Sequence, residues 1–226
     1  TLIKRYYDDK GFKNAEVFID QKDDPNNEGQ VIVEIVVDKK EKVKVNAITI
    51  VGNEVLTDKK LKRTMKKTNE KNKLVNFFRT KKFVEENFEA DKQLIIDKYN
   101  EMGYRDATIL VDSVSPHDDK TVNVYLEIDE GQRYYLRNVN WVGNTLYSAE
   151  QMDYLLRMKK GDVYNQKLLS ERVAEDEDAI SNLYYNNGYI FSSVEPVEVN
   201  IVGDSIDLEM RVIEGPQATI NKVSIN

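Results

Sequence analysis

The sequence predicts an α+β fold of tandem β-α-α-β-β repeats, each a three-stranded mixed sheet covered by two helices. Three different strings recur in the same order along the 226 residues, at intervals of roughly 84–92 residues. The first string is rich in Ile and Val and leads to Gly-Asn; its copies start at Val45, Leu136 and, in part, Ile220. The second is rich in tyrosine, and its copies start at Tyr6, Tyr99 and Tyr184. The third alternates apolar and polar residues, and its copies start at Val31, Val122 and Ile206. Such a period indicates an array, cut inside a repeat at both ends.

The first string predicts the opening strand of each repeat and the turn after it. Ile48 and Ile50 share one face of this strand, and Gly52-Asn53 closes it. Trp141 aligns with Ile50 and is expected in the core. A helix then begins at Thr57 or, in the next copy, at Ser148, whose partner Gln151 completes a capping box.

A longer second helix is expected to follow, with one apolar face. Ile95 and Tyr99 lie four residues apart, as do Ile180 and Tyr184, so each pair should be buried against the sheet. The acidic run Glu171–Asp178 is expected on the outer face of this helix. Glycines follow the helices where a left-handed residue is favoured, at Gly11, Gly103 and Gly188.

Two strands complete each repeat. In the last strand, apolar residues alternate with polar ones, which predicts one buried and one wetter face. Pro196 falls in the preceding strand, and proline is tolerated where a backbone N–H is not needed in the ladder. This strand is therefore expected at a sheet edge. Asp23–Gly29 is expected to be a hairpin turn rather than a calcium loop, and His117 to be an exposed residue at the matching turn.

The composition argues against catalysis. The chain has no cysteine and one histidine, which excludes thiolate sites and metal sites built on two histidines. It carries no phosphate-binding glycine motif and no nucleophile motif. No apolar run approaches the ~18 residues of a membrane helix. We therefore expect no catalytic residues, no metal site and no cofactor.

The combined motifs resemble those of POTRA (polypeptide-transport-associated) domains. They are strand–Gly-Asn (Gly52-Asn53, Gly143-Asn144), the helix-ending Tyr99–Tyr104 and Tyr184–Tyr189, and strand–Glu-Gly (Glu130-Gly131, Glu214-Gly215); the first copy departs from them at Asp38-Lys39-Lys40. The expected domains are residues 1–41 (the last part of one POTRA), 42–132 and 133–216 (two complete ones) and 217–226 (the first strand of another).

The resemblance implies function by binding, as part of an outer-membrane assembly factor of the BamA family. It implies a periplasmic location at the outer membrane of a Gram-negative bacterium, beside a C-terminal β-barrel. The implied partners are unfolded outer-membrane proteins and accessory lipoproteins, with contact to the membrane surface also open and nucleic acid not expected. The alternatives are the POTRA region of a related secretion or translocation transporter, or a purely structural tandem array.

Two surfaces are candidates for binding. The first is a strand edge at Arg105–Ser113 that could pair with an extended client peptide, with the alternative that a neighbouring domain covers it. Its candidate residues are Arg105, Asp106, Ala107, Thr108, Ile109, Leu110 and Val111.

The second surface is basic and apolar. Between Lys59 and Lys82 there are eleven Lys or Arg and one acid, Glu70, in a chain of net charge −7. The candidate docking residues are Lys59, Lys62, Arg63, Lys66, Lys67, Phe77, Phe78 and Arg79, which could meet anionic lipid or an acidic partner. A solvated helix face with the two phenylalanines packed inward is the alternative.

Overall fold

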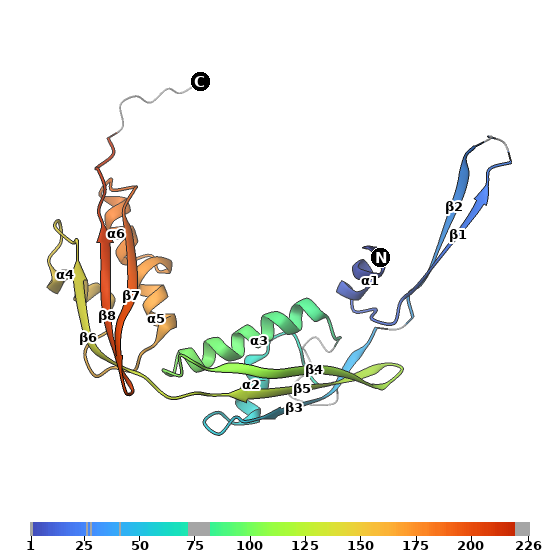
Figure 1. The fold of residues 1–226 in the computed structure, drawn as a ribbon, viewed down its shortest axis with the longest axis horizontal. Helices are drawn as coiled ribbons and strands as arrows, with labels where there is room; N and C mark the ends of the chain where they lie inside the picture. The colour runs from blue at the N-terminus through green and yellow to red at the C-terminus, as the bar shows by residue number, and fades with distance from the viewer. Residues whose placement is uncertain (1, 26, 28, 41, 72–81, 220–226) are drawn as a thin grey trace. The chain divides into compact units, whose positions relative to one another are not determined.

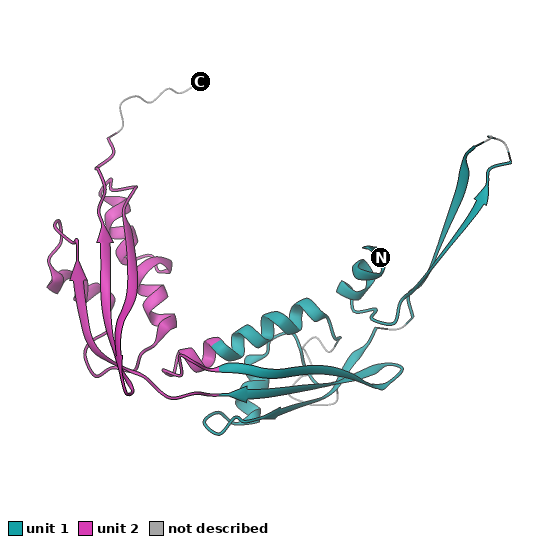
Figure 2. Cartoon of the chain, viewed as in Figure 1, with its two compact units in different colours: residues 1–96, 108–129 teal, residues 97–107, 130–226 magenta. Residues whose placement is uncertain are grey.

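The computed structural model describes residues 2–25, 27, 29–40, 42–71 and 82–219. The chain forms two compact units, shown in Figure 2. Unit 1 comprises residues 1–96 and 108–129, and unit 2 comprises residues 97–107 and 130–226. The seven residues expected to form most of a further opening strand, 220–226, lie outside the described part of the chain.

Unit 1 contains a short helix, a hairpin and a three-stranded sheet (Figure 1). Its elements are α1 (Leu2–Asp9), β1 (Glu16–Asp23), β2 (Val31–Asp38), β3 (Lys44–Val51), α2 (Asp58–Thr64), most of α3 (Glu85–Asn100), β4 (Thr108–Asp118) and β5 (Thr121–Asp129). The sheet order is β3-β5-β4, with β3 parallel and β4 antiparallel to β5.

Unit 2 repeats this arrangement. Its elements are β6 (Tyr135–Val142), α4 (Ala149–Leu156), α5 (Gln166–Ser170), the π-helix η2 (Glu171–Glu175), α6 (Ile180–Asn186), β7 (Ser193–Val202) and β8 (Ser205–Ile213). The order is β6-β8-β7, again with one parallel and one antiparallel pair. The predicted α+β repeats with mixed three-stranded sheets are therefore confirmed, and Pro196 does lie in an edge strand.

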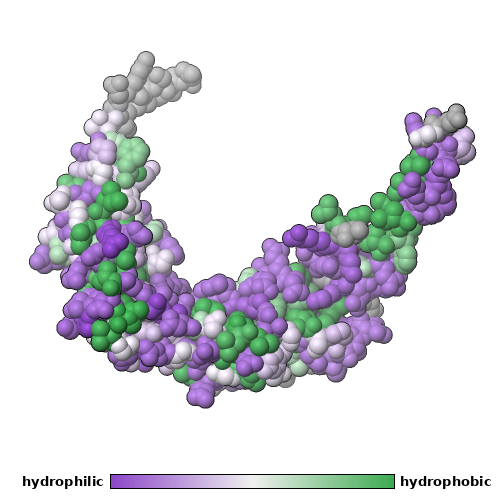
Figure 3. All heavy atoms as spheres, viewed as in Figure 1, coloured by the Kyte–Doolittle hydropathy of each residue, from purple (hydrophilic) through white to green (hydrophobic). Residues whose placement is uncertain are grey.

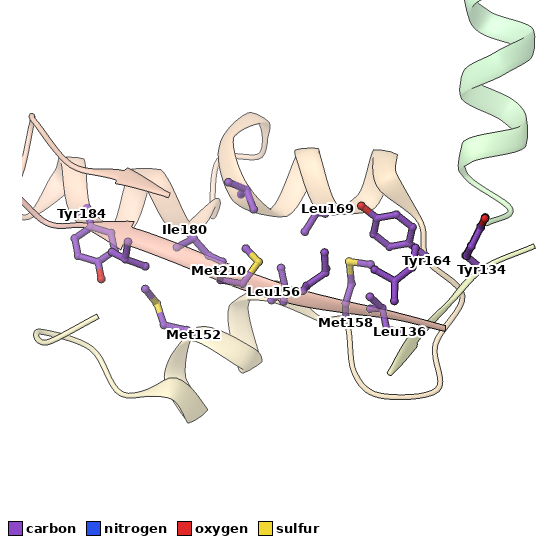
Figure 4. Packing of buried hydrophobic residues seen from close by; sticks show 14 residues of the cluster. Tyr134, Leu136, Met152, Leu156, Met158, Tyr164, Leu169, Ile180, Tyr184 and Met210 are labelled. Carbon is purple, nitrogen blue, oxygen red and sulfur yellow. The ribbon is translucent and has the colours of Figure 1, made fainter. Parts of the chain in front are cut away.

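The core of each sheet lies on the predicted helix and strand faces. Ile95, Tyr99, Ile180 and Tyr184 are all 0% exposed, as the four-residue spacing predicted. Figure 4 shows the helix residues of unit 2 gathered along β8, around Met210. Trp141 is only half-buried: it packs against this cluster, and its Nε1 donates to Asp153 at 2.7 Å.

The second helix of unit 2 differs from the prediction, because it is broken between η2 and α6. Arg172 is 2% exposed, and its guanidinium donates to the carboxylates of Asp176 and Asp178 and to the Leu155 carbonyl. These aspartates therefore do not form the outer face of a continuous helix. They leave the helical path to neutralise a buried cation, which would otherwise be costly to desolvate.

The Gly-Asn motif has a structural explanation. Gly52 has φ of +80°, and a Cβ there would lie 2.0 Å from the Ile128 carbonyl oxygen. Gly143 has φ of +89° and the same close approach, 2.1 Å, to the Val212 oxygen. Any side chain would collide with the central strand, so only glycine fits the end of the opening strand.

The tyrosine and Glu-Gly motifs are joined by hydrogen bonds. Tyr99 donates its hydroxyl to Glu130 at 2.7 Å, and Tyr184 donates to Glu214 at 3.2 Å. Burial and the neighbouring carboxylate raise the pKa of both tyrosines, so the hydroxyls stay protonated donors. The recurring tyrosine and glutamate residues that carry the family resemblance therefore join the end of the second helix to the end of the last strand in each of the two repeats.

The hairpin β1–β2 departs from the expected alternation of buried and wet positions. Its large apolar residues are about half exposed, including Phe18, Ile19, Ile32 and Ile35. Apolar surface is visible along the hairpin in Figure 3. One face of a strand is buried, as in β5 and β8, only where a layer of helices packs on it. The helix α1 has no buried residue, so it does not form such a layer over the hairpin.

Asp207 gives the fold a pH-dependent contribution. Arg137 donates to both of its carboxylate oxygens and Asn138 to one, which lowers the pKa of Asp207 to about 2. Because the folded pKa lies below the unfolded value, the ionised form stabilises the fold above about pH 4, and this contribution is lost between about pH 4 and pH 2. In urea unfolding, Asp207→Asn should flatten the pH dependence in that window. An unchanged slope would contradict this role.

Candidate functional site

The outer edge of β4 is the open edge of the sheet in unit 1. On the opposite edge, Lys71 donates its backbone N–H to the Val45 carbonyl at 2.8 Å, and the Glu70 carboxylate accepts the N–H of Ile48 at 3.0 Å. No described segment pairs with β4 on the side away from β5. An extended peptide therefore has backbone groups to pair with along β4.

Proline identifies which β4 groups face outward. Pro116 pairs with Val122 but has no N–H, so this is a non-hydrogen-bonded pair. Antiparallel pairs alternate, so the backbone N–H groups of Val114 and Asp112 also point away from β5, and Ile109 does so across the intervening bulge. These three N–H groups are the donors that the edge offers.

A β-bulge shapes the first half of this edge. The register shifts between Ile109 and Val111, so that Leu110 is the extra residue. Leu110 is 58% and Val111 45% exposed, whereas Ile109 and Val114 are half-buried toward the helices. Bulges limit edge-to-edge pairing of sheets, so this edge suits a short peptide better than a long second sheet.

A groove of about 320 Å³ runs between α3 and β4, with Lys92 at its centre. The strand contributes Thr108, Ile109 and Asp112, and the helix contributes Glu89, Lys92, Gln93 and Ile96. Lys92 forms ion pairs with Asp112 and with Glu89. Burial opposes its charge, but the hydrogen bonds that the ammonium group donates to these two carboxylates outweigh burial and raise the pKa of Lys92. The groove therefore keeps a paired ammonium group beside the edge.

The start of the predicted edge needs a correction. Arg105, Asp106 and Ala107 precede β4 and form a turn, in which the Ala107 N–H donates to the Tyr104 carbonyl. Arg105 is engaged in an ion pair with Glu198 at 3.0 Å, and Asp106 accepts from the Tyr134 hydroxyl. Thr108, Ile109, Leu110 and Val111 lie in the strand.

The predicted basic face is described only in part. Lys59, Arg63, Lys66 and Lys67 are exposed, on α2 and the loop after it. Lys62 is half-buried and pairs with Glu70 at 3.2 Å. Phe77, Phe78 and Arg79 lie outside the described residues, so the apolar half of this surface stays a prediction. It is not brought together with the β4 groove by any described contact.

Sequence reasoning missed the residue that fixes the basic loop, Asp91. Its carboxylate is 1% exposed and accepts the backbone N–H groups of Lys66, Lys67 and Thr68 at 2.7, 3.0 and 2.6 Å. A signal was available, because Asp91 lies three residues after Phe88 and four before Ile95, on the apolar face of the helix. A carboxylate on a buried face requires donors nearby.

None of the helices in the described part of the chain is both long and apolar enough to cross a membrane. Within the described residues, no group of three or more acidic, histidine or cysteine side chains is placed to hold a metal ion.

Comparison with known proteins assigns both three-stranded sheets to one family model. The POTRA model, described as "Surface antigen variable number repeat", matches residues 43–131 and 134–215. A putative outer membrane protein assembly factor of Treponema pallidum is 24% identical, over 99% of this chain and 26% of that protein. The outer membrane protein assembly factor BamA of Neisseria meningitidis serogroup B is 28% identical, over 87% of this chain and 24% of that protein. The chain thus spans about a quarter of the length of these relatives.

Solved structures show the same fold. The chain matches POTRA3-5 of Haemophilus influenzae BamA with a TM-score of 0.54 and 21% identity, over 93% of this chain and 76% of that one. It also matches Haemophilus ducreyi BamA lacking POTRA domains 1-3, with a TM-score of 0.53 and 18% identity, over 75% of this chain and 29% of that one.

Proposed function

The chain belongs to the POTRA family, and from this premise we propose that it is the periplasmic part of an outer-membrane assembly factor that receives unfolded client proteins. The proposed clients are outer-membrane proteins on their way to a β-barrel domain of the parent protein, and accessory lipoproteins are proposed as further partners. The names of the relatives support this class of function. The mode of action is binding, with no cofactor.

One observation carries the proposal: the free edge of β4 beside the α3 groove. A client that pairs through its backbone can have almost any sequence, which suits a receptor for many proteins. The groove then receives alternate side chains of the added strand, because side chains along a strand point to opposite faces. Exposed Leu110 and Val111 offer apolar contact on the solvent side of the bulge.

The matching edge in unit 2 is less suitable. Pro196 pairs with Met210 on the central strand of unit 2, and Asp112 pairs with the equivalent residue, Leu126, in unit 1. Proline therefore occupies the position at which β4 has an outward N–H donor. The edge of β7 therefore lacks the N–H that β4 presents at Asp112. We propose that β4 is the client-binding strand of the two.

Replacing an outward donor by proline tests this assignment. Ile109→Pro should leave the β5 ladder intact and weaken capture of unfolded outer-membrane protein peptides, about 5–10-fold for the loss of one backbone hydrogen bond. The measurement is photo-cross-linking or fluorescence titration with such peptides, with circular dichroism as the control for folding.

Asp112→Pro is the matched second variant, since Pro196 shows that a proline is accommodated at that register position. Capture equal to wild type by both folded variants would remove β4 as the binding strand. The structural-array alternative predicts that no client peptide binds to the wild type at all.

A further inference from the structure

A larger groove lies in unit 2, on the opposite edge of its sheet from β7. It has a volume of about 720 Å³ and runs along residues 138–140 of β6. Its other walls are α4, through Asp153 and Tyr154, and the segment that follows α4, residues 157–162. This groove takes no part in the proposed capture of clients at β4.

The corresponding place in unit 1 is filled by a carboxylate of the chain itself. Glu70 is 7% exposed, and its Oε1 accepts the backbone N–H of Ile48 at 3.0 Å and an N–H of Lys62 Nζ at 3.2 Å. The next residue, Lys71, anchors the loop by donating its N–H to the Val45 carbonyl. The edge of β3 is thereby closed by an internal acidic side chain.

In unit 2 the same edge has no such side chain. Ile48 pairs with Val124 and Val139 pairs with Leu208, after a register shift at the same point of each strand, so Val139 occupies the place of Ile48. Gly161 donates to the Leu136 carbonyl at 2.7 Å, as Lys71 does to that of Val45. The residue before it, where unit 1 has Glu70, is Lys160.

No side-chain oxygen of the described residues replaces Glu70 at the Val139 N–H. Instead, a basic loop borders the groove, with Arg157, Lys159 and Lys160 among its lining residues. The two acidic lining residues are engaged: Asp153 accepts from Trp141 Nε1, and Asp162 accepts the Lys159 N–H at 2.9 Å. Arg157 is already ion-paired with Asp178 at 2.6 Å, so the basic side chains that accompany the outward backbone donor are Lys159 and Lys160. This combination favours an anion.

The groove also suits a peptide rather than a small free ion. It follows a strand edge, where an extended chain can pair with the backbone of β6. Tyr154 is 81% exposed at its border, so that an aromatic face is available to the side chains of a bound segment.

We propose that this groove binds an extended peptide segment that carries a carboxylate, which accepts the Val139 N–H in the way Glu70 accepts that of Ile48. In unit 1 this carboxylate comes from the chain's own loop, and in unit 2 the bound peptide provides it. Its carboxylate comes either from an Asp or Glu side chain or from the end of the peptide chain.

Synthetic peptides test the required chemistry. The probe is an eight-residue peptide of alternating Thr and Val with a central Glu, acetylated and amidated at its ends. Binding to the 226-residue chain is followed by the fluorescence of its single tryptophan, Trp141, which donates to a residue of the groove, and by the amide NMR signal of Val139. We expect the Glu peptide to shift both signals and the isosteric Gln peptide to bind about 10-fold more weakly.

A third peptide distinguishes the two sources of the carboxylate. It has the central Gln but a free C-terminus. Binding tighter than that of the Glu peptide assigns the site to chain ends, equal binding shows that it accepts either carboxylate, and weak binding assigns it to acidic side chains. Equal affinity of all three peptides would overturn the inference.

Lys160→Glu is the decisive variant, because it restores the residue that unit 1 has at this position. The new carboxylate should occupy the Val139 N–H and reduce binding of the Glu peptide at least about 10-fold, while Lys160→Gln, which only removes the charge, should weaken it less. In the β4 variant Ile109→Pro, the Val139 amide signal should respond to this peptide as it does in wild type. An unchanged Val139 response in Lys160→Glu, or loss of the Val139 response in Ile109→Pro, would show that the peptide lies elsewhere and overturn the proposal.

Discussion

Ile95→Ala is expected to lower the free energy of unfolding by about 2–5 kcal/mol, the range found for large-to-small changes in well-packed cores. Ile95 is fully buried on the inner face of α3, and the surrounding side chains cannot close the cavity completely. Urea unfolding followed by circular dichroism measures the change. The same substitution at Ile180 should have an effect of the same size in unit 2, where Trp141 fluorescence reports unfolding.

Ile96→Ala is the matched control for this prediction. It removes the same side chain from the next residue of the same helix, but Ile96 is only half-buried and borders the β4 groove. We expect Ile96→Ala to cost clearly less than Ile95→Ala. A loss below about 0.5 kcal/mol for Ile95→Ala would mean that the buried face of α3 is wrongly assigned.

Asp91→Ala is expected to destabilise unit 1 by about 2–4 kcal/mol, because it leaves three backbone N–H groups of the basic loop without their acceptor. The Thr68 end of this loop is buried, so water cannot fully replace the carboxylate there. Urea unfolding measures the loss. Hydrogen exchange should also show faster exchange at Lys66, Lys67 and Thr68 than in wild type.

Two further variants define the cause. Asp91→Asn keeps one oxygen acceptor and should cost less than Asp91→Ala. Glu86→Gln removes an exposed carboxylate from the first turn of the same helix and should change stability by less than about 1 kcal/mol. If Asp91→Ala cost no more than Glu86→Gln, the three hydrogen bonds would not be what holds the loop.

The residues that stabilise the fold differ from those proposed to bind a ligand. Gly52, Gly143 and the Tyr99–Glu130 pair recur because each repeat needs them to close its sheet and helix end. The proposed binding features lie where the repeats differ. On one sheet edge, Asp112 of unit 1 is replaced by Pro196 at the equivalent position of unit 2. On the other edge, Glu70 of unit 1 is replaced by Lys160 of unit 2. Both proposals therefore rest on differences between the two copies of the fold and not on the shared motifs.

The sequence by itself determined the repeat, the order of elements, the buried faces and the edge position of Pro196. These features depend on local periodicity: side chains four apart share a helix face, side chains two apart share a strand face, and proline cannot donate to a ladder. Ile95 and Ile180 could therefore be assigned to the core without any knowledge of their neighbours in space.

Only the tertiary structure decided the break in the second helix of unit 2, the bulge at Leu110, and the acceptors that Asp91 and Glu70 provide. Each depends on groups far apart in the sequence, such as Thr68 and Asp91, which are 23 positions apart. The charge pattern predicted that Asp176 and Asp178 lie on a helix surface. This was wrong because the Arg172 side chain is buried beside them, which the pattern does not show. A buried charge takes its partners from whatever the fold brings within hydrogen-bonding distance, and local pattern does not encode that distance.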